Sequence, residues 1–206
     1  MIVVCVNCFN DMPILKKCVE SVYDQVDRII AVDGRYKDFP GDGWYSTDGT
    51  IEYLSSLDKV KLVFAADLYE AEKRNIYMDM LKTGDTVLVL DGDEVVQGDI
   101  RKFDKNTDIG LVLLGEPGQR YKRLATRFFK YRKHLRHNGI HFILEIKGKW
   151  FNNRCNAVNG FIQKNVNTFK INHLHRKRSK ARKQFKEIYK ISARSRESQF
   201  KTAPYE

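Results

Sequence analysis

Three carboxylates occur together directly after an apolar run. They are Asp91, Asp93 and Glu94, and the preceding residues Thr86–Leu90 predict a buried parallel strand. In open α/β sheets the carboxyl ends of the strands line the ligand site, and carboxylate oxygens bind hard divalent cations that bridge phosphate groups. A metal-held phosphate substrate is therefore the first hypothesis. A solvated acidic turn at Gly92 fits so short a pattern as well.

The composition predicts one folded domain with a substantial core. The chain has 206 residues, of which 42% are hydrophobic. Met1–Val6 is too short for a signal peptide, and no stretch approaches the roughly 20 apolar residues of a membrane span. We therefore expect a cytoplasmic protein, peripheral to a membrane at most. Four cysteines, of which Cys5 and Cys8 lie in or next to a buried-looking strand, predict reduced thiols rather than disulfides or zinc ligands.

Charge divides the chain into two halves. Residues 1–118 carry 13 Lys/Arg and 22 Asp/Glu, a net charge of −9, whereas residues 119–206 carry 24 and 4, a net charge of +20. This division predicts an acidic half that contains the carboxylate cluster and a basic half that meets an anionic acceptor. Alternatively, the two sets of charges intermix in space within one domain.

Strand and helix patterns alternate in the acidic half. Apolar residues recur at helical spacing after the expected N-cap Asp11 with Pro13 in the first turn, after the expected cap Ser46–Asp48, and over Leu68–Leu81. The alternation predicts a Rossmann-like three-layer α/β/α fold with a parallel sheet. The expected strands are Ile2–Asn7, Arg28–Val32, Val60–Ala65 and Thr86–Leu90.

The basic half shows strand patterns that predict a mixed or antiparallel sheet. A basic stretch from His175 to about Arg196 has apolar residues on a helical period and predicts a C-terminal helix. The expected strands are Ile109–Leu114, Leu124–Tyr131, Phe142–Ile146 and Val166–Ile171.

Several short motifs, taken in order, resemble the family 2 type of nucleotide-sugar glycosyltransferases with the GT-A fold. Residues 35–45 would be an insertion relative to that family. The resemblance implies one GT-A domain over 1–206, a mixed sheet, and sugar transfer from a nucleoside-diphosphate sugar, commonly a UDP-sugar, to a hydroxyl acceptor. The motifs are Cys8-Phe9-Asn10, Asp33 with Ser46–Thr50, Arg74-Asn75, Asp91-Gly92-Asp93, Arg127–Lys130, His137–His141 and Ile171–His173.

The same resemblance implies roles for the matched residues. Asp91, Asp93 and His173 would hold Mn²⁺ or Mg²⁺, which leaves Glu94 outside the ligand set. Asp91 would also share in donor binding. The other donor-binding residues would be Cys8, Phe9, Asn10, Asp33, Arg74 and Asn75. An arginine can pair with phosphate through its fork of donors. Without the resemblance, Asp33 also fits a turn and Arg74 a solvent-facing helix position.

The general base does not follow from the motifs, because Phe142 stands where the family pattern expects Glu. An inverting transfer needs a base that removes the proton of the acceptor hydroxyl. The candidates, in order, are Glu145, His141 and Glu116.

Two basic series predict a polyanionic acceptor. We expect nucleic acid, for example a hydroxymethylated base in DNA, with interleaved aromatic residues either stacking on bases or packing in the core. The alternative acceptor is a lipid-linked or cell-surface glycan at an anionic membrane. A nucleic-acid-binding module without enzyme activity is the alternative from another class. The series are Arg120, Lys122, Arg123, Arg127, Lys130, Arg132, Lys133 and Arg136, then Arg176, Lys177, Arg178, Lys180, Arg182, Lys183, Lys186 and Lys190.

Overall fold

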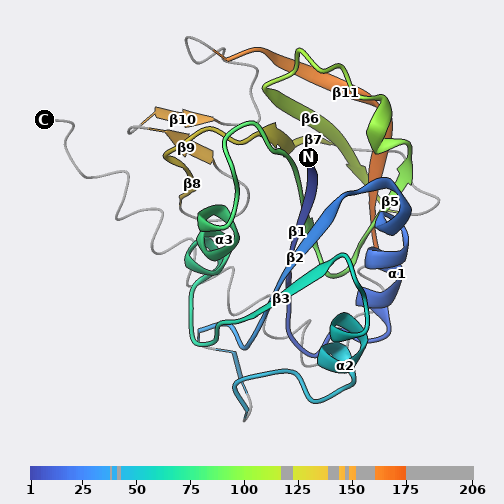
Figure 1. Ribbon diagram of the computed structural model, residues 1–206, viewed down its shortest axis with the longest axis vertical. Helices are drawn as coiled ribbons and strands as arrows, with labels where there is room; N and C mark the ends of the chain where they lie inside the picture. Colours follow the sequence, from blue (N-terminus) through green and yellow to red (C-terminus); the bar gives the residue numbers. More distant parts are fainter. Residues whose placement is uncertain are drawn as a thin grey trace, which may run out of the picture.

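A large mixed sheet runs through the computed structural model and contains strands from both halves of the chain (Figure 1). The structure describes residues 1–37, 39–40, 43–116, 123–138, 144–146, 149–151 and 161–174. Among these, eight strands form the sheet. Their order is β3 (Val60–Phe64), β2 (Arg28–Asp33), β1 (Ile2–Cys8), β4 (Thr86–Asp91), β7 (Arg123–Lys130), β6 (Ile109–Gly115), β11 (Gln163–His173) and β5 (Glu94–Gly98).

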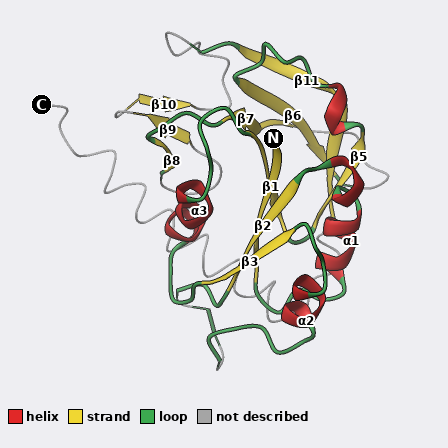
Figure 2. Ribbon diagram, in the orientation of Figure 1, coloured by secondary structure: helices red, strands yellow, loops and turns green. Residues whose placement is uncertain are grey.

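The four strands β3, β2, β1 and β4 are parallel and confirm the strands expected in the acidic half. The apolar runs of β1, β2 and β4 are almost wholly buried because helices cover both faces. Figure 2 shows α1 (Ile14–Glu20) and α2 (Thr50–Ser55) on one side of these strands and α3 (Glu70–Asp79) on the other. Short 3₁₀ turns occupy Tyr23–Gln25 and Ile100–Lys102.

Two hydrophobic cores lie on the two faces because alternate strand residues point in opposite directions. Val4, Val6 and Cys8 of β1 belong to the core beneath α1 and α2. Val3 and Cys5 belong to the core beneath α3. The alternation therefore decides which helix each side chain at a strand end will face.

The start of α1 differs from the expected capped start. Asp11 does not cap the helix, because Pro13 occupies the N-cap position without a side-chain hydrogen bond. The Asp11 carboxylate instead accepts a hydrogen bond of 3.1 Å from the backbone N–H of Phe9. Asp11 thus shapes the turn that leaves β1.

The second half of the chain adds both antiparallel and parallel pairs. β7 is antiparallel to β4 and β6, whereas β11 is parallel to β6 and antiparallel to β5. β5 was not predicted. A small sheet contains β10 (Lys149–Phe151), β9 (Leu144–Ile146) and β8 (Leu135–His137), of which only β9 was anticipated. The predicted helix at 175–196 lies outside the described residues. Within the described part of the chain, no helix has the length and apolarity needed to cross a membrane.

Candidate functional site

Asp91 is the last residue of β4 and faces α3. Val87 and Val89 of the same strand pack in the core beneath α3, and strand alternation places Asp91 on that face. Its side chain is 29% exposed, although the rest of β4 is buried. The predicted position at the carboxyl end of a parallel strand is therefore the observed one.

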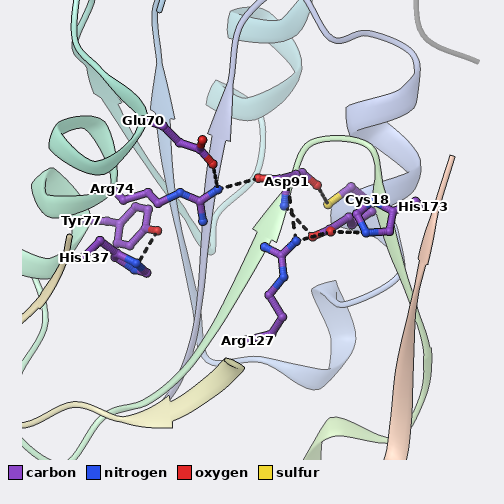
Figure 3. Close-up of polar contacts among 9 residues, drawn as sticks. Cys18, Glu70, Arg74, Tyr77, Asp91, Arg127, His137 and His173 are labelled. Atoms are coloured by element: carbon purple, nitrogen blue, oxygen red, sulfur yellow. Dashed lines mark hydrogen bonds and ion pairs between the residues drawn. The ribbon is translucent and has the colours of Figure 1, made fainter. Parts of the chain in front are cut away.

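Two buried arginines share the Asp91 carboxylate (Figure 3). Nη2 of Arg74, on α3, lies 3.0 Å from Oδ1, and Nη2 of Arg127, on β7, lies 3.5 Å from Oδ2. Each arginine also binds a second carboxylate. Arg74 pairs with Glu70 at 2.5 Å, and Arg127 pairs with Glu94. We call this group of five residues the arginine–carboxylate cluster.

The cluster gives its two guanidinium groups different electrostatic surroundings. Burial alone would lower the pKa of Arg74, but the negative charges near it, led by Glu70, outweigh burial and raise that pKa. Burial lowers the pKa of Arg127 despite Glu94 and Asp91. Arginine remains protonated in proteins at ordinary pH. Two fixed positive charges therefore lie at the carboxyl end of β4.

Glu94 is a residue that the sequence reasoning undervalued. It is fully buried and begins β5. Its Oε2 accepts a hydrogen bond of 2.8 Å from the backbone N–H of Asp91, and its Oε1 binds both Arg127 and, at 3.0 Å, Nε2 of His173. Glu94 therefore connects the end of β4 to β7 and β11. A sequence signal did exist, since an arginine inside an apolar strand such as β7 requires a buried partner.

The predicted metal ligands do not form a ligand set as they lie. Asp91 is engaged by two guanidinium groups, and His173 pairs with Glu94. Asp93 is buried in the turn after β4, where its backbone oxygen accepts a hydrogen bond from the N–H of Leu174. The described residues contain no group of three or more metal-binding side chains suited to an ion. The structure thus shows Asp91 paired with Arg74 and Arg127, and the metal assignment stays a prediction.

Asp33 ends β2 on the opposite face of the sheet. Ile29 and Ala31 of β2 lie in the core beneath α1 and α2, which places Asp33 on that side. It is fully buried and accepts hydrogen bonds from the N–H of Ser46 at 2.9 Å and from its hydroxyl at 2.5 Å. Ser46 therefore anchors the loop to β2 instead of capping α2, whose N-cap is Gly49.

The remaining predicted donor residues of β1 and its turn support that loop. The Cys8 thiol lies 3.7 Å from Asp33, and Phe9 is buried with its ring 5.3 Å from that of Phe39. The Asn10 side chain accepts a hydrogen bond of 2.8 Å from the N–H of Thr47. In this arrangement the Phe9 ring serves core packing instead of presenting an open surface for a base.

Asn75 links α3 to the small sheet. Its side-chain amide exchanges two hydrogen bonds with the backbone of His137, at 2.9 and 3.0 Å. Of the three candidate bases, Glu145 lies in β9 and accepts a hydrogen bond from Asn138. Glu116 follows β6 and is partly buried, and His141 lies outside the described residues.

Lys73 was not identified from the sequence, although it is fully buried. Its ammonium donates a hydrogen bond of 2.9 Å to the carbonyl of Cys8 and another to the carbonyl of Gly34, and it lies 4.3 Å from the centre of the Tyr36 ring. Lys73 thereby ties α3 to the carboxyl ends of β1 and β2. Nothing in the sequence around a lysine in a helix distinguishes a buried lysine of this kind from an exposed one.

Three members of the first basic series pair with acidic side chains of the protein. Arg127 is buried in the cluster, Arg132 binds Asp108 at 2.8 Å, and Arg136 binds Asp79 at 2.6 Å. Phe128, Phe129 and Tyr131 are buried, as expected for the core-packing alternative and not for stacking on bases. Arg120, Lys122 and the whole second series lie outside the described residues.

Comparison with known proteins gives only remote structural similarity. No family model and no curated protein matches the chain. A crystal structure of S. aureus TarS matches with a TM-score of 0.44 and 19% identity, over 58% of this chain and 22% of that one. Its residues 1–349 match with a TM-score of 0.41 and 18% identity, over 59% and 38%. The same fragment in complex with UDP-GlcNAc gives 0.40 and 18%, over 59% and 37%. At these values the similarity carries no argument about activity, so the proposal below rests on the residues.

Proposed function

We propose that the chain is a glycosyltransferase of GT-A type that moves a sugar from a nucleoside-diphosphate sugar to a hydroxyl acceptor. The observation that carries the proposal is the shared Asp91 carboxylate, held by Arg74 and Arg127 at the carboxyl end of a parallel strand. This edge is where open α/β sheets bind ligands. The ordered motifs that resemble nucleotide-sugar glycosyltransferases independently select the same residues.

The cluster suits a diphosphate because its positive charges are fixed in advance. A guanidinium group matches phosphate oxygens through paired N–H donors. When a phosphate oxygen replaces Asp91, Arg74 still pairs with Glu70 and Arg127 still pairs with Glu94. Each buried guanidinium group therefore keeps a counterion. Negative charge grows on the diphosphate as the sugar–phosphate bond breaks, and preorganised donors stabilise that charge.

The acceptor hydroxyl must lose its proton as it attacks the anomeric carbon. We propose Glu145, His141 and Glu116, in that order, as the base for an inverting transfer. Replacing the true base by its amide, or His141 by Gln, should lower the transfer rate at least about 100-fold with little change in donor affinity. Equal losses in all three variants would indicate damage to the fold.

The metal requirement stays a prediction with its own test. An ion held by Asp91, Asp93 and His173 would supply further positive charge to the diphosphate. If the prediction is right, manganese raises the affinity for UDP and Asp93→Asn removes that gain. If neither manganese nor a chelator changes the affinity for UDP, the diphosphate is bound by the two arginines without a metal ion.

The acceptor also stays a prediction. Sugar transfer to duplex DNA with hydroxymethylated bases would support the nucleic-acid acceptor. Transfer to lipid-linked or free glycans would support the alternative. The pairing of Arg132 with Asp108 and of Arg136 with Asp79 removes part of the support for DNA.

Donor binding provides the central experiment. We expect UDP or a UDP-sugar to raise the Tm of the chain, since ligands that bind only the folded state stabilise it. Arg74→Lys should weaken UDP binding about tenfold, because lysine lacks the fork of donors. Arg132→Lys, which changes an arginine bound to Asp108, is the matched control. DNA binding without any response to nucleotides would support the non-enzyme module instead.

A further inference from the structure

Three exposed aromatic side chains gather at the carboxyl end of the outer parallel strands. Trp44 is 53% exposed, Tyr45 43% and Phe64 51%. Large exposed apolar side chains elsewhere in the described ranges are Met1 and Ile162. Clustered exposed apolar surface marks a binding site more often than single exposed residues do. We call Trp44, Tyr45 and Phe64 the aromatic rim.

The rim is attached to the ends of β2 and β3. Phe64, the last residue of β3, pairs in register with Asp33, and its ring lies 5.2 Å from that of Tyr45 at 76°. Tyr45 directly precedes Ser46, whose backbone and hydroxyl both bind Asp33. The buried carboxylate therefore holds the rim in place. Trp44 and Tyr45 belong to the segment that reads as an insertion relative to the resembled family.

Arg35 is a cation beside the rim, and it pairs with an acidic side chain. The Arg35 guanidinium lies 4.5 Å from the centre of the Trp44 ring and 3.9 Å from the carboxylate of Asp67. The backbone N–H of Arg35 also donates to the Trp44 carbonyl at 2.8 Å. Residues 1–118, which include the whole rim, carry a net charge of −9. This surface therefore disfavours a polyanion, which would need unpaired Lys and Arg.

We propose that the aromatic rim binds an uncharged sugar ring of a glycan acceptor. Aromatic rings offer a broad apolar face, and the Trp N–H and Tyr O–H add hydrogen bonds at its margin. This combination matches a neutral sugar, which has apolar C–H faces edged by hydroxyls. The proposal rests on the proposed glycosyltransferase activity, and it selects a glycan over nucleic acid as acceptor.

Tryptophan fluorescence tests the rim directly. The chain has two tryptophans, Trp44 and Trp150, so Trp150→Phe leaves Trp44 as the single reporter. We expect maltotriose, lactose or chitotriose to change its emission saturably. Phe64→Ala and Tyr45→Ala should each weaken that binding about tenfold, in the range of one lost aromatic contact. Ile162→Ala, which removes an exposed apolar side chain outside the rim, should leave it unchanged.

Three results would overturn the proposal. One is that none of the three sugars changes Trp44 emission. Another is that UDP changes the emission and that Phe64→Ala weakens UDP binding, which would show that the rim binds the donor. The third is that a ten-residue oligothymidylate binds the rim more tightly than the sugars. The Tm rise with UDP is measured in parallel on the same variants. If UDP raises the Tm but no sugar changes the Trp44 emission, the sugar-binding role of the rim is rejected and the proposed glycosyltransferase function is retained.

Discussion

Asp33 and Asp91 end the two strands that flank β1, yet their surroundings differ. Asp33 is fully buried and accepts hydrogen bonds from neutral groups, the N–H and hydroxyl of Ser46 and the thiol of Cys8. Asp91 is partly exposed and is shared by two arginines. Strand alternation turns Asp33 toward α1 and α2 and Asp91 toward α3. Equal chemical groups at one edge of the sheet therefore occupy separate environments.

The contrast separates a structural carboxylate from one that can change partners. Asp33 fixes a loop, and any loss of its hydrogen bonds opens that loop. Each arginine beside Asp91 has a second carboxylate, so Asp91 can release them to a ligand without leaving a buried charge unpaired. We infer that the Asp91 side is built for ligand exchange and the Asp33 side for support.

The largest expected effect comes from Glu94, which maintains the Asp91 side. Glu94→Gln removes the buried charge that Arg127 and His173 both contact, and should lower the free energy of unfolding by about 3 kcal/mol. Urea denaturation measures the change. Glu20→Gln, in an exposed pair with Lys16, is the matched control and should cost at most about 0.5 kcal/mol. Similar losses in both variants would contradict the assignment of Glu94.

A pair of matched substitutions tests the contrast itself. Asp33→Asn weakens the two hydrogen bonds from Ser46 and should cost about 1–3 kcal/mol of unfolding free energy. Asp91→Asn should cost about 1 kcal/mol or less, because Arg74 and Arg127 keep their other partners. Sugar transfer should nevertheless fall more in Asp91→Asn. The opposite order of stability losses would remove the distinction between the two carboxylates.

The pH dependence of stability reports on the positive charge of the Asp91 side. Burial, with Arg74 and Arg127, holds the pKa of His137 well below its ordinary value of 6.5. Below pH 6.5 the unfolded chain binds this proton and the folded chain does not. The unfolding free energy should therefore decrease as pH falls, by up to about 1.4 kcal/mol per pH unit.

Denaturant unfolding measured from pH 7.5 down to about pH 5 checks this dependence. His137→Gln should flatten the curve in that window, and His134→Gln, at an exposed position, controls for the loss of a histidine. An unchanged slope in His137→Gln would show that another group carries the pH dependence.

Local patterns predicted much of the acidic half. Its four parallel strands and three helices follow from apolar runs and helical spacing, which act over a few residues. Asp91 was placed correctly because the strand before it is uniformly apolar. The strands β8 and β10 have three residues each, too few for a periodic pattern to show.

Long-range contacts account for what the sequence could not reveal. Glu94 becomes buried because Arg127 and His173 reach it from strands more than 30 residues away. The burial of Lys73 and Asp33 also depends on long-range contacts. Lys73 reaches its partner where α3 meets the strand ends, and Asp33 reaches its partner where the loop at Ser46 meets them. The intermixing of the two sets of charges is also a long-range effect, since Arg132 and Arg136 pair with Asp108 and Asp79 of the first half.

The pairing of β5 has a consequence for how the protein forms during synthesis. β5 directly follows Asp91 in the chain but pairs with β11, whose residue His173 also contacts Glu94. The acidic half can therefore leave the ribosome with its parallel strands made and Asp91 beside Arg74, while Glu94 still lacks Arg127 and His173. Contacts of such long sequence separation form slowly. Burial of Glu94 is thus a late folding event, which waits for Arg127 of β7 and then for His173 of β11.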